Sequence, residues 1–224
     1  MIDYIKNKIM LSPLAPAFVI ATRKHKTFNL NEEFYKYFYN SYNTTWYNER
    51  TVEIPIAYRY FEACAGSKLE IGNVLQHYYK LDRTDLDIVD RFEKGYKVIN
   101  EDILTFSPNK KYNAILSIST MEHIGQDYGE EHDGKKLMKA FKHVIDLLAV
   151  NGEFFCTMPI GENPVVDKNL ELNRFGFDEE YYMKRISEDN KWVQCLKNEA
   201  LEMEYGKPYD FANAIVIGII HAKG

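Results

Sequence analysis

Six residues lie at the ends of predicted strands and have side chains that can bind a ligand or take part in its reaction. Carboxylates accept hydrogen bonds from hydroxyl and amino groups, glycine lets a ligand approach the backbone closely, and histidine exchanges a proton near neutral pH. Together such groups suit the binding of a polar organic molecule and a proton transfer beside it. The six residues are Glu70, Gly72, Asp90, Asp102, Glu122 and His123.

The pattern of apolar residues after residue 50 predicts the elements that position these side chains. The run 112–118 is apolar almost throughout, as is typical of a central strand covered on both faces. Helices are predicted at 55–65, 74–81 and 135–150, and strands at 68–71, 87–90, 97–100, 112–118, 153–158, 192–196 and 212–222. This order predicts an α/β fold with a Rossmann-like, doubly wound, mostly parallel seven-stranded sheet and an antiparallel edge strand.

Two segments stand apart from this alternation. Residues 1–49 are expected to form an aromatic-rich N-terminal extension to an α/β domain at 50–224, serving as a lid, a substrate wall or the subunit interface of a homo-oligomer. The polar connection 159–190 is expected to be a functional loop, with a helix as one reading of 181–187. Strands 192–196 and 212–222 are expected to pair with each other at the sheet edge.

The predicted strand ends favour a nucleoside-containing ligand. In open α/β sheets, ligands bind beyond the carboxyl ends of the strands, where the strand order reverses. Asp90 follows Gly72 by about 20 residues, a spacing typical of an acid that binds ribose hydroxyls. Asp102 could accept a hydrogen bond from an exocyclic amine, and Ile103 could cover the face of an adenine ring.

The same residues resemble the motifs of class I S-adenosylmethionine (SAM)-dependent methyltransferases, over about residues 50 to 222. Glu70 and Gly72 match the start of the family's first motif, an acidic residue followed by x-G-x-G-x-G. Val74 and Gln76 stand where the motif has its later glycines. Their side chains leave less space for a ligand at the predicted loop. Segment 119–124, Ser-Thr-Met-Glu-His-Ile, is similar to the LEHI signature of many small-molecule methyltransferases.

The resemblance implies a cofactor, a reaction and a set of site residues. The cofactor is SAM, and the reaction is methyl transfer to a hydroxyl or an amine of a small-molecule or sugar-like acceptor. Asp90 matches the family's ribose-binding acid and Asp102 its adenine-binding acid, while His123 and Glu122 are the candidate catalytic residues. Cofactor contacts are expected from Glu70, Gly72, Asn73, Val74, Asp90, Arg91, Asp102, Ile103, Ser117 and Ser119.

Two other functions remain open at the level of sequence. A non-catalytic binding or assembly protein would explain the replaced glycines and the aromatic extension. A nicotinamide-dependent oxidoreductase is disfavoured because residues 72–77 lack the glycines of G-x-G-x-x-G. Taken singly, Asp90, Asp102 and His123 could also be turn or capping residues.

The composition of the chain disfavours several classes of binding partner. The formal net charge of −5 disfavours nucleic acid, because nucleic-acid-binding surfaces collect lysine and arginine. The three cysteines, Cys64, Cys156 and Cys195, are widely spaced, so neither a disulfide framework nor a zinc site is predicted, and no metal is expected. No apolar run has the length of a membrane span and the N-terminal residues do not resemble a signal peptide, so a cytosolic protein without a membrane partner is expected.

Overall fold

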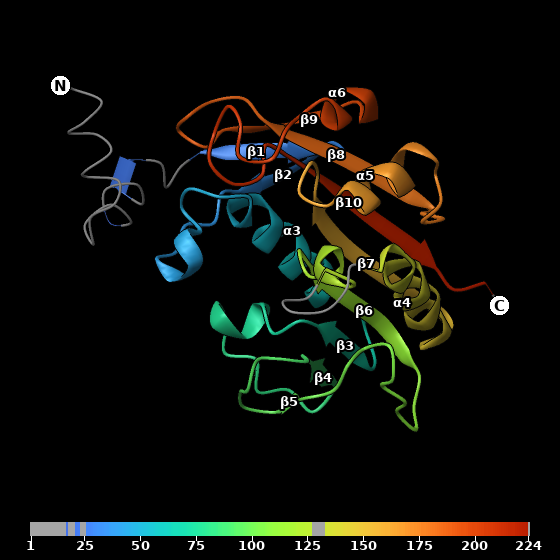
Figure 1. Cartoon of the computed structure of the whole chain (residues 1–224). Coiled ribbons are helices and arrows are strands. Elements are labelled where there is room, and N and C mark those ends of the chain that lie inside the picture. The colour runs from blue at the N-terminus through green and yellow to red at the C-terminus, as the bar shows by residue number, and fades with distance from the viewer. Residues whose placement is uncertain (1–16, 18–20, 23–25, 127–132, 224) are drawn as a thin grey trace.

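The structure is a computed structural model that describes residues 17, 21–22, 26–126 and 133–223. Its centre is an eight-stranded sheet with the order β5-β4-β3-β6-β7-β10-β8-β9 (Figure 1). β5, β4, β3, β6 and β7 run parallel, and β10, β8 and β9 follow as antiparallel neighbours. The strands are β3 (Lys68–Ile71), β4 (Leu86–Val89), β5 (Val98–Ile99), β6 (Tyr112–Ile118), β7 (Leu148–Pro159), β8 (Glu179–Arg185), β9 (Trp192–Cys195) and β10 (Ala214–His221).

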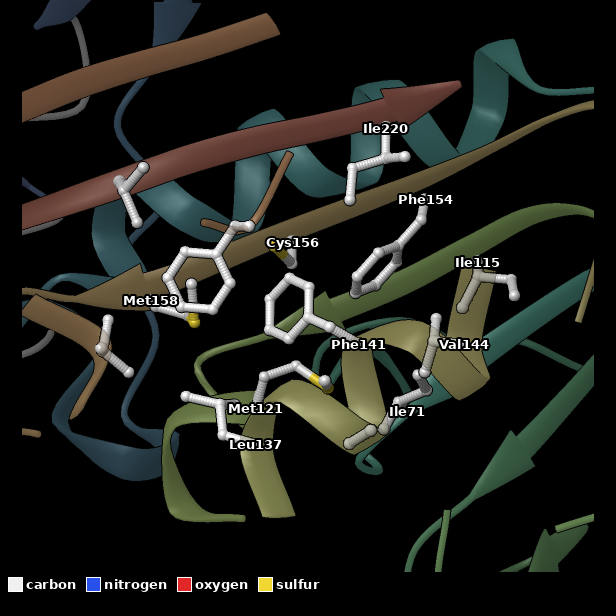
Figure 2. Close-up of a cluster of buried hydrophobic side chains, with 14 of the residues drawn as sticks. Ile71, Ile115, Met121, Leu137, Phe141, Val144, Phe154, Cys156, Met158 and Ile220 are labelled. Carbon is white, nitrogen blue, oxygen red and sulfur yellow. The ribbon is translucent and has the colours of Figure 1, made fainter. Parts of the chain in front are cut away.

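Helices cover both faces of this sheet (Figure 1). α3 (Arg50–Ala63) packs on one face and α4 (Gly134–Asp146) on the other, with the shorter α5 (Pro164–Glu171) and α6 (Lys197–Leu201) near the antiparallel end. Phe141 and Val144 of α4 face Phe154, Cys156 and Met158 of β7 (Figure 2). Phe155 points to the α3 side, as the two-residue period of a strand requires. The predicted α/β class with a mostly parallel, doubly wound sheet is therefore confirmed.

The predicted sheet was one strand short. β8 occupies most of the segment for which a helix was one reading, and its residues Tyr182 and Met183 are buried on opposite faces. Because β8 lies between β10 and β9, the predicted direct pairing of strands 192–196 and 212–222 is wrong. The connection 159–190 likewise contains α5 and β8 and is not one long loop.

Two helix predictions also need correction. The predicted helix 74–81 is only a 3-10 turn, η2 (Leu75–His77), after which Tyr79 turns to stack on Tyr58 with ring centroids 3.7 Å apart. The helix predicted at 135–150 ends at Asp146, because Leu148 already pairs with Tyr112 in the sheet. Hydrophobic periodicity alone does not distinguish the end of a helix from the start of a buried strand.

The first helix, whose start the sequence places between Arg50 and Pro55, begins at Arg50 and ends at Ala63, and it joins the preceding segment to the domain. Pro55 has no N–H to donate to Thr51, four residues before it. The Thr51 carbonyl instead accepts a hydrogen bond from Phe38 N at 2.9 Å, and Thr51 Oγ1 donates to Phe38 O at 2.9 Å. The proline thus leaves a backbone acceptor that fixes residue 38 against α3.

Residues 26–49 contain a small hairpin, β1 (Thr27–Leu30) and β2 (Glu33–Lys36), and the 3-10 turn η1 (Tyr42–Thr44). The hairpin packs beside β9, where Asn31 N donates to Gln194 Oε1 at 2.8 Å. Phe28, Leu30 and Trp46 are buried. The aromatic side chains of this segment that the structure describes therefore pack largely against the domain, and residues 1–16, 18–20 and 23–25 lie outside the described part.

Arg185 joins three segments near the end of β8. Its side chain is 1% exposed and lies between the rings of Tyr47 and Tyr209, with Cζ 4.8 and 4.7 Å from the two centroids. The guanidinium donates to four backbone carbonyls. These belong to Tyr47, Ser187, Glu188 and Asp210, at 2.9 to 3.2 Å.

We expect Arg185→Ala to lower the free energy of unfolding by about 2 to 4 kcal/mol, because it leaves these carbonyls without a donor and removes two cation–π contacts. Urea unfolding followed by circular dichroism measures the change. Arg174→Ala, at an exposed arginine, is the control and should change stability by less than about 0.5 kcal/mol. Equal effects of the two substitutions would contradict the role given to Arg185.

Candidate functional site

A pocket of about 340 Å³ opens at the carboxyl ends of β3, β4 and β6. β3 has β4 on one side and β6 on the other, so the strand order reverses here. This is the place where open α/β sheets bind ligands, and the volume is within the usual range for small-molecule sites. The lining residues are Ile71, Gly72, Val89, Asp90, Arg91, Phe92, Glu93, Glu101, Asp102, Ile103, Leu104, Thr120, His123, Ile124 and Lys136.

The loop after β3 is held by the buried carboxylate of Glu70. Its Oε1 accepts hydrogen bonds from Val74 N at 3.1 Å and Leu75 N at 2.7 Å, and its Oε2 has no hydrogen-bond partner. Burial raises the pKa of Glu70 to about 7, against the effect of these two bonds. Gly72 has φ of +85°, and a Cβ there would lie 2.4 Å from Thr120 Oγ1, so both conformation and space require glycine.

Asp90 builds the next turn. Oδ1 accepts from Phe92 N at 2.8 Å and Glu93 N at 2.7 Å, and Oδ2 accepts from Asn73 N at 3.1 Å. A carboxylate has about four acceptor positions, so roughly one remains for a ligand hydroxyl. Asp90 therefore connects the loops after β3 and β4 in addition to lining the pocket.

Asp102 and Ile103 form the side of the pocket beyond β5. Asp102 Oδ1 accepts from Leu104 N at 2.9 Å, and Oδ2 lies 3.5 Å from Arg91 Nη1. Ile103 is buried, and Phe92, which also lines the pocket, is 68% exposed. An acceptor beside two apolar side chains suits a flat heterocycle that carries an amino group.

Glu122 and His123 lie in the 3-10 turn after β6, η3 (Met121–His123). The His123 side chain is 59% exposed and lines the pocket, whereas Glu122 is 1% exposed and lies behind it. His123 Nε2 is 3.7 Å from Glu122 Oε1. Burial raises the pKa of Glu122 well above its ordinary value, and neighbouring Glu162 and Glu53 add to the effect.

Behind this turn, the start of α3 meets the ends of β6 and β7. Arg50 Nη1 donates to Ile118 O at 2.8 Å and lies 3.7 Å from Glu53 Oε2, while Ser119 Oγ donates to Glu53 Oε1 at 2.6 Å. Burial lowers the pKa of Arg50, but the carboxylates of Glu53 and Glu49 outweigh this and raise it above its ordinary value. We call the acidic side chains around Arg50 the glutamate cluster; its members are Glu49, Glu53, Glu122 and Glu162.

The structure brings together about half of the residues proposed from the sequence. Gly72, Asp90, Arg91, Asp102, Ile103 and His123 line the pocket. Glu70 and Val74 lie in the loop below it, and Asn73 binds Glu93 Oε1 through its amide. Ser117 is buried without a hydrogen-bond partner for its hydroxyl, Ser119 binds Glu53, and Glu122 belongs to the glutamate cluster; these three do not line the pocket.

Sequence reasoning missed several lining residues. Phe92 and Glu93 follow Asp90 directly, Thr120 precedes Glu122, and Lys136 lies in the first turn of α4. Proximity to the ends of predicted strands could have identified the first three. Lys136 comes from a helix that only the folded chain brings to the pocket, so no local pattern marks it.

The loop after β3 is better suited to a nucleoside than to a dinucleotide. A pyrophosphate needs free backbone N–H groups at this loop. Here the N–H groups of Asn73, Val74 and Leu75 already donate to the carboxylates of Asp90 and Glu70. The same carboxylates repel a diphosphate and attract a cationic group. SAM combines a nucleoside with a cationic sulfonium, and it fits the residues present.

Neither a metal centre nor a membrane-spanning helix is found within the part of the chain that the structure describes. There, no three histidine, cysteine, aspartate or glutamate side chains form a group that could hold a metal ion. No helix among the same residues is both long and apolar enough to cross a membrane.

The pKa of Glu70 gives a prediction for stability. The folded protein retains a proton on Glu70 up to about pH 7, whereas the unfolded chain releases it near pH 4.5, so this group makes stability fall as pH rises between these values. Glu70→Gln keeps an acceptor for Val74 N and Leu75 N but has no charge to bury. We expect the stability of Glu70→Gln relative to wild type to rise by up to about 3 kcal/mol between pH 4.5 and pH 8.

Thermal unfolding at closely spaced pH values measures this difference. Any constant penalty from burying the amide leaves the pH dependence unchanged. Glu204→Gln, at an exposed glutamate, is the matched control and should show a difference that does not vary in this window. A pH-independent difference for Glu70→Gln would show that the Glu70 pKa is not raised.

Comparisons with known proteins identify similar structures but no similar sequences. No protein-family model matches the chain, and no curated protein does either. N-methyltransferase NodS from Bradyrhizobium japonicum WM9, in complex with S-adenosyl-L-homocysteine (SAH), matches 73% of this chain and 81% of its own at 11% identity and a TM-score of 0.47. A SAM-dependent methyltransferase from Archaeoglobus fulgidus matches 77% and 95% at 15% identity and a TM-score of 0.46. One from Clostridium acetobutylicum ATCC 824 matches 75% and 89% at 15% identity and a TM-score of 0.40. These three structures are methyltransferases by their descriptions.

Proposed function

We propose that the chain is a SAM-dependent methyltransferase that acts on a hydroxyl or amine of a small-molecule or sugar-like acceptor. One observation carries the proposal: Gly72, Asp90, Asp102, Ile103 and His123, which follow four different strands, line a single pocket where the strand order reverses. A set of unrelated turn residues would not be expected to converge on one cavity.

Each part of the pocket has a proposed role. The remaining acceptor position of Asp90 binds a ribose hydroxyl, Asp102 Oδ2 accepts from the adenine amino group, and Ile103 covers the ring. The loop at Gly72 and Thr120 lies against the methionine part. When bound, SAM supplies an electrophilic methyl group, so the protein mainly has to align the acceptor and, for a protonated acceptor, remove a proton.

His123 and Glu122 are the proposed proton-handling residues. His123 is on the pocket wall and can reach an acceptor directly. Burial raises the pKa of Glu122 and favours its protonated form, so Glu122, whose Oε1 lies 3.7 Å from His123 Nε2, is the proposed proton donor and His123 the proposed base. A proton that His123 removes from an acceptor can pass to solvent, because 59% of the His123 side chain is exposed.

Two alternatives are separated by ligand binding. The carboxylates in the loop after β3 argue against the nicotinamide-dependent oxidoreductase. A non-catalytic protein would have no need for a pocket with adenosine-binding groups. The expectations of a cytosolic location, of no nucleic-acid or membrane partner, of a homo-oligomer and of a domain boundary at residue 49 stay predictions.

We expect SAM and SAH to raise the melting temperature of the purified protein, and NAD to leave it unchanged. A ligand at about a hundred times its Kd adds about 2.7 kcal/mol, or several degrees for a chain of this size. No shift with saturating SAM or SAH would support the non-catalytic alternative. A shift with NAD alone would support the oxidoreductase.

Asp102→Asn tests the adenine contact without disturbing the turn, because asparagine still accepts from Leu104 N. We expect its Kd for SAH to rise about tenfold, as for the loss of one hydrogen bond to a charged group. Asp146→Asn, at an exposed position on α4, is the control and should bind SAH as the wild type does. Unchanged affinity of Asp102→Asn in calorimetry would remove Asp102 from the site.

His123→Ala is expected to keep its affinity for SAH and to lose about a hundredfold in the rate of methyl transfer, since His123 is assigned to the acceptor and not to the cofactor. The rate is measured by transfer of a labelled methyl group from SAM to a panel of small alcohols and amines. A full rate with any acceptor that the wild type methylates would exclude His123 from proton transfer.

A further inference from the structure

The glutamate cluster contains buried oxygens that accept no hydrogen bond, although two of them lie in ion pairs at 3.7 Å, Glu53 Oε2 with Arg50 and Glu122 Oε1 with His123. Both carboxylate oxygens of Glu122 and Oε2 of Glu53 are buried without a hydrogen-bond partner. Glu122 is 1% exposed and Glu53 is fully buried. Buried polar atoms in folded proteins almost always have a partner, so each exception needs a reason.

Other members of the cluster are better satisfied. Glu49 Oε2 accepts from Ala212 N at 3.3 Å, and Glu53 Oε1 accepts from Ser119 Oγ. Asn163 Nδ2 donates to the backbone carbonyl of Glu122 and holds the turn that carries it, but does not reach its carboxylate. The unmet hydrogen-bonding capacity is therefore concentrated on Glu122 and on one oxygen of Glu53.

Arg50 cannot supply the hydrogen bonds that these oxygens lack. Its Nη1 donates to Ile118 O and its Nη2 to Ser119 O, and Nη1 lies 3.7 Å from Glu53 Oε2. Burial raises the pKa values of Glu49, Glu122 and Glu162, and the neighbouring glutamates add to this effect. A cationic ligand with several N–H donors would donate to these oxygens and stabilise the ionised form of the carboxyls.

The cluster adjoins the candidate pocket. Thr120 and His123, on either side of Glu122 in sequence, both line the pocket, and His123 Nε2 lies 3.7 Å from Glu122 Oε1. Only the turn that carries these side chains separates the pocket from the carboxylate. Glu162, which is only partly buried, forms another side of the cluster.

An organic ammonium group fits the buried oxygens of the cluster better than a metal ion does. Within residues 26–126 and 133–223, no three acidic or metal-binding side chains come close enough to form a metal site. An ammonium group has three donors that point in different directions and can reach carboxylates too far apart to share one metal ion.

We propose that the glutamate cluster binds the ammonium group of a small-molecule amine, which makes an amine rather than an alcohol the acceptor class of this site. The role of the amine as methyl acceptor rests on the proposed function, whereas its binding does not. As an acceptor, the ammonium must first give one proton to His123, because only a nitrogen with a lone pair can form a bond to the methyl carbon. A hydroxyl group has a single donor and no charge, so an alcohol would leave most of the buried oxygens without a hydrogen bond.

The test is calorimetric titration of the full chain, with and without SAH, at 150 mM NaCl to screen surface charges. The probes are three amines, namely 1,4-diaminobutane, 2-phenylethylamine and glucosamine, and their hydroxyl counterparts 1,4-butanediol, 2-phenylethanol and glucose. We expect at least one amine to bind at least tenfold more tightly than its counterpart. Binding to partly protonated carboxyls should also release protons, so the measured enthalpy should depend on the buffer.

Glu122→Gln should weaken amine binding at least tenfold. Glu162→Gln should also weaken it, and because Glu162 is only partly buried, this variant is less prone to misfold. Glu204→Gln, an exposed glutamate paired with Lys207, should bind as the wild type does. Far-ultraviolet circular dichroism checks that each variant folds.

The proposal is overturned if no amine binds, if amines bind no better than their hydroxyl counterparts, or if both Glu122→Gln and Glu162→Gln keep full affinity. SAH binding without amine binding would keep the methyltransferase and overturn the amine subsite. Amine binding without SAH binding would keep the subsite and refute the proposed function.

Discussion

The structure around the candidate site depends on the hydrogen bonds and ion pairs of the buried Arg50 guanidinium. It lies at the first residue of α3 and donates to the last carbonyls of β6, Ile118 O and Ser119 O. An arginine buried in this way is stable only with carboxylates and acceptors around it, since an unpaired buried charge is costly. Glu53 pairs with this guanidinium at 3.7 Å, and the other glutamates of the cluster lie near the carboxyl end of β6 with raised pKa values.

The loop after β3 follows the same electrostatic rule on a smaller scale. Carboxylates of Glu70 and Asp90 occupy the backbone N–H groups that other nucleotide-binding folds present to phosphate. The replaced glycines at Val74 and Gln76 agree with this, because no diphosphate has to approach the backbone there. Of these acidic residues Asp90 lines the pocket, whereas Glu122 of the glutamate cluster lies behind the turn that carries His123.

The parts of the fold and site that were predictable from the sequence are those determined by residues close together in the chain. Strands such as 112–118 were placed correctly because near-continuous burial leaves a local pattern, and so were the pocket residues that directly follow such strands. β8 was missed because its alternation is interrupted by charged residues and its place is set by pairing with β10, about 30 residues later. Glu122 was recognised as a functional candidate, but its assignment to a cluster with Glu49, Glu53 and Glu162 depends on contacts between α3, η3 and the end of β7 that no local spacing encodes.

The position of α3 connects these observations to the fold. Because Pro55 has no N–H group, the Thr51 carbonyl has no donor within the helix and accepts a hydrogen bond from Phe38 N instead. This bond holds the segment before α3 against the first turns of the helix. Those same turns carry Glu49, Arg50 and Glu53, so the interaction that fixes the N-terminal segment also fixes the geometry of the glutamate cluster. Burying Glu49, Glu53 and Glu122 there opposes folding, and the hydrophobic packing of α3 on the sheet must offset it. Replacing Glu122 alone by an apolar side chain of similar size would remove part of that opposition and leave Arg50 paired with Glu53, so the pairing of Arg50 does not by itself account for the acidic residue at position 122.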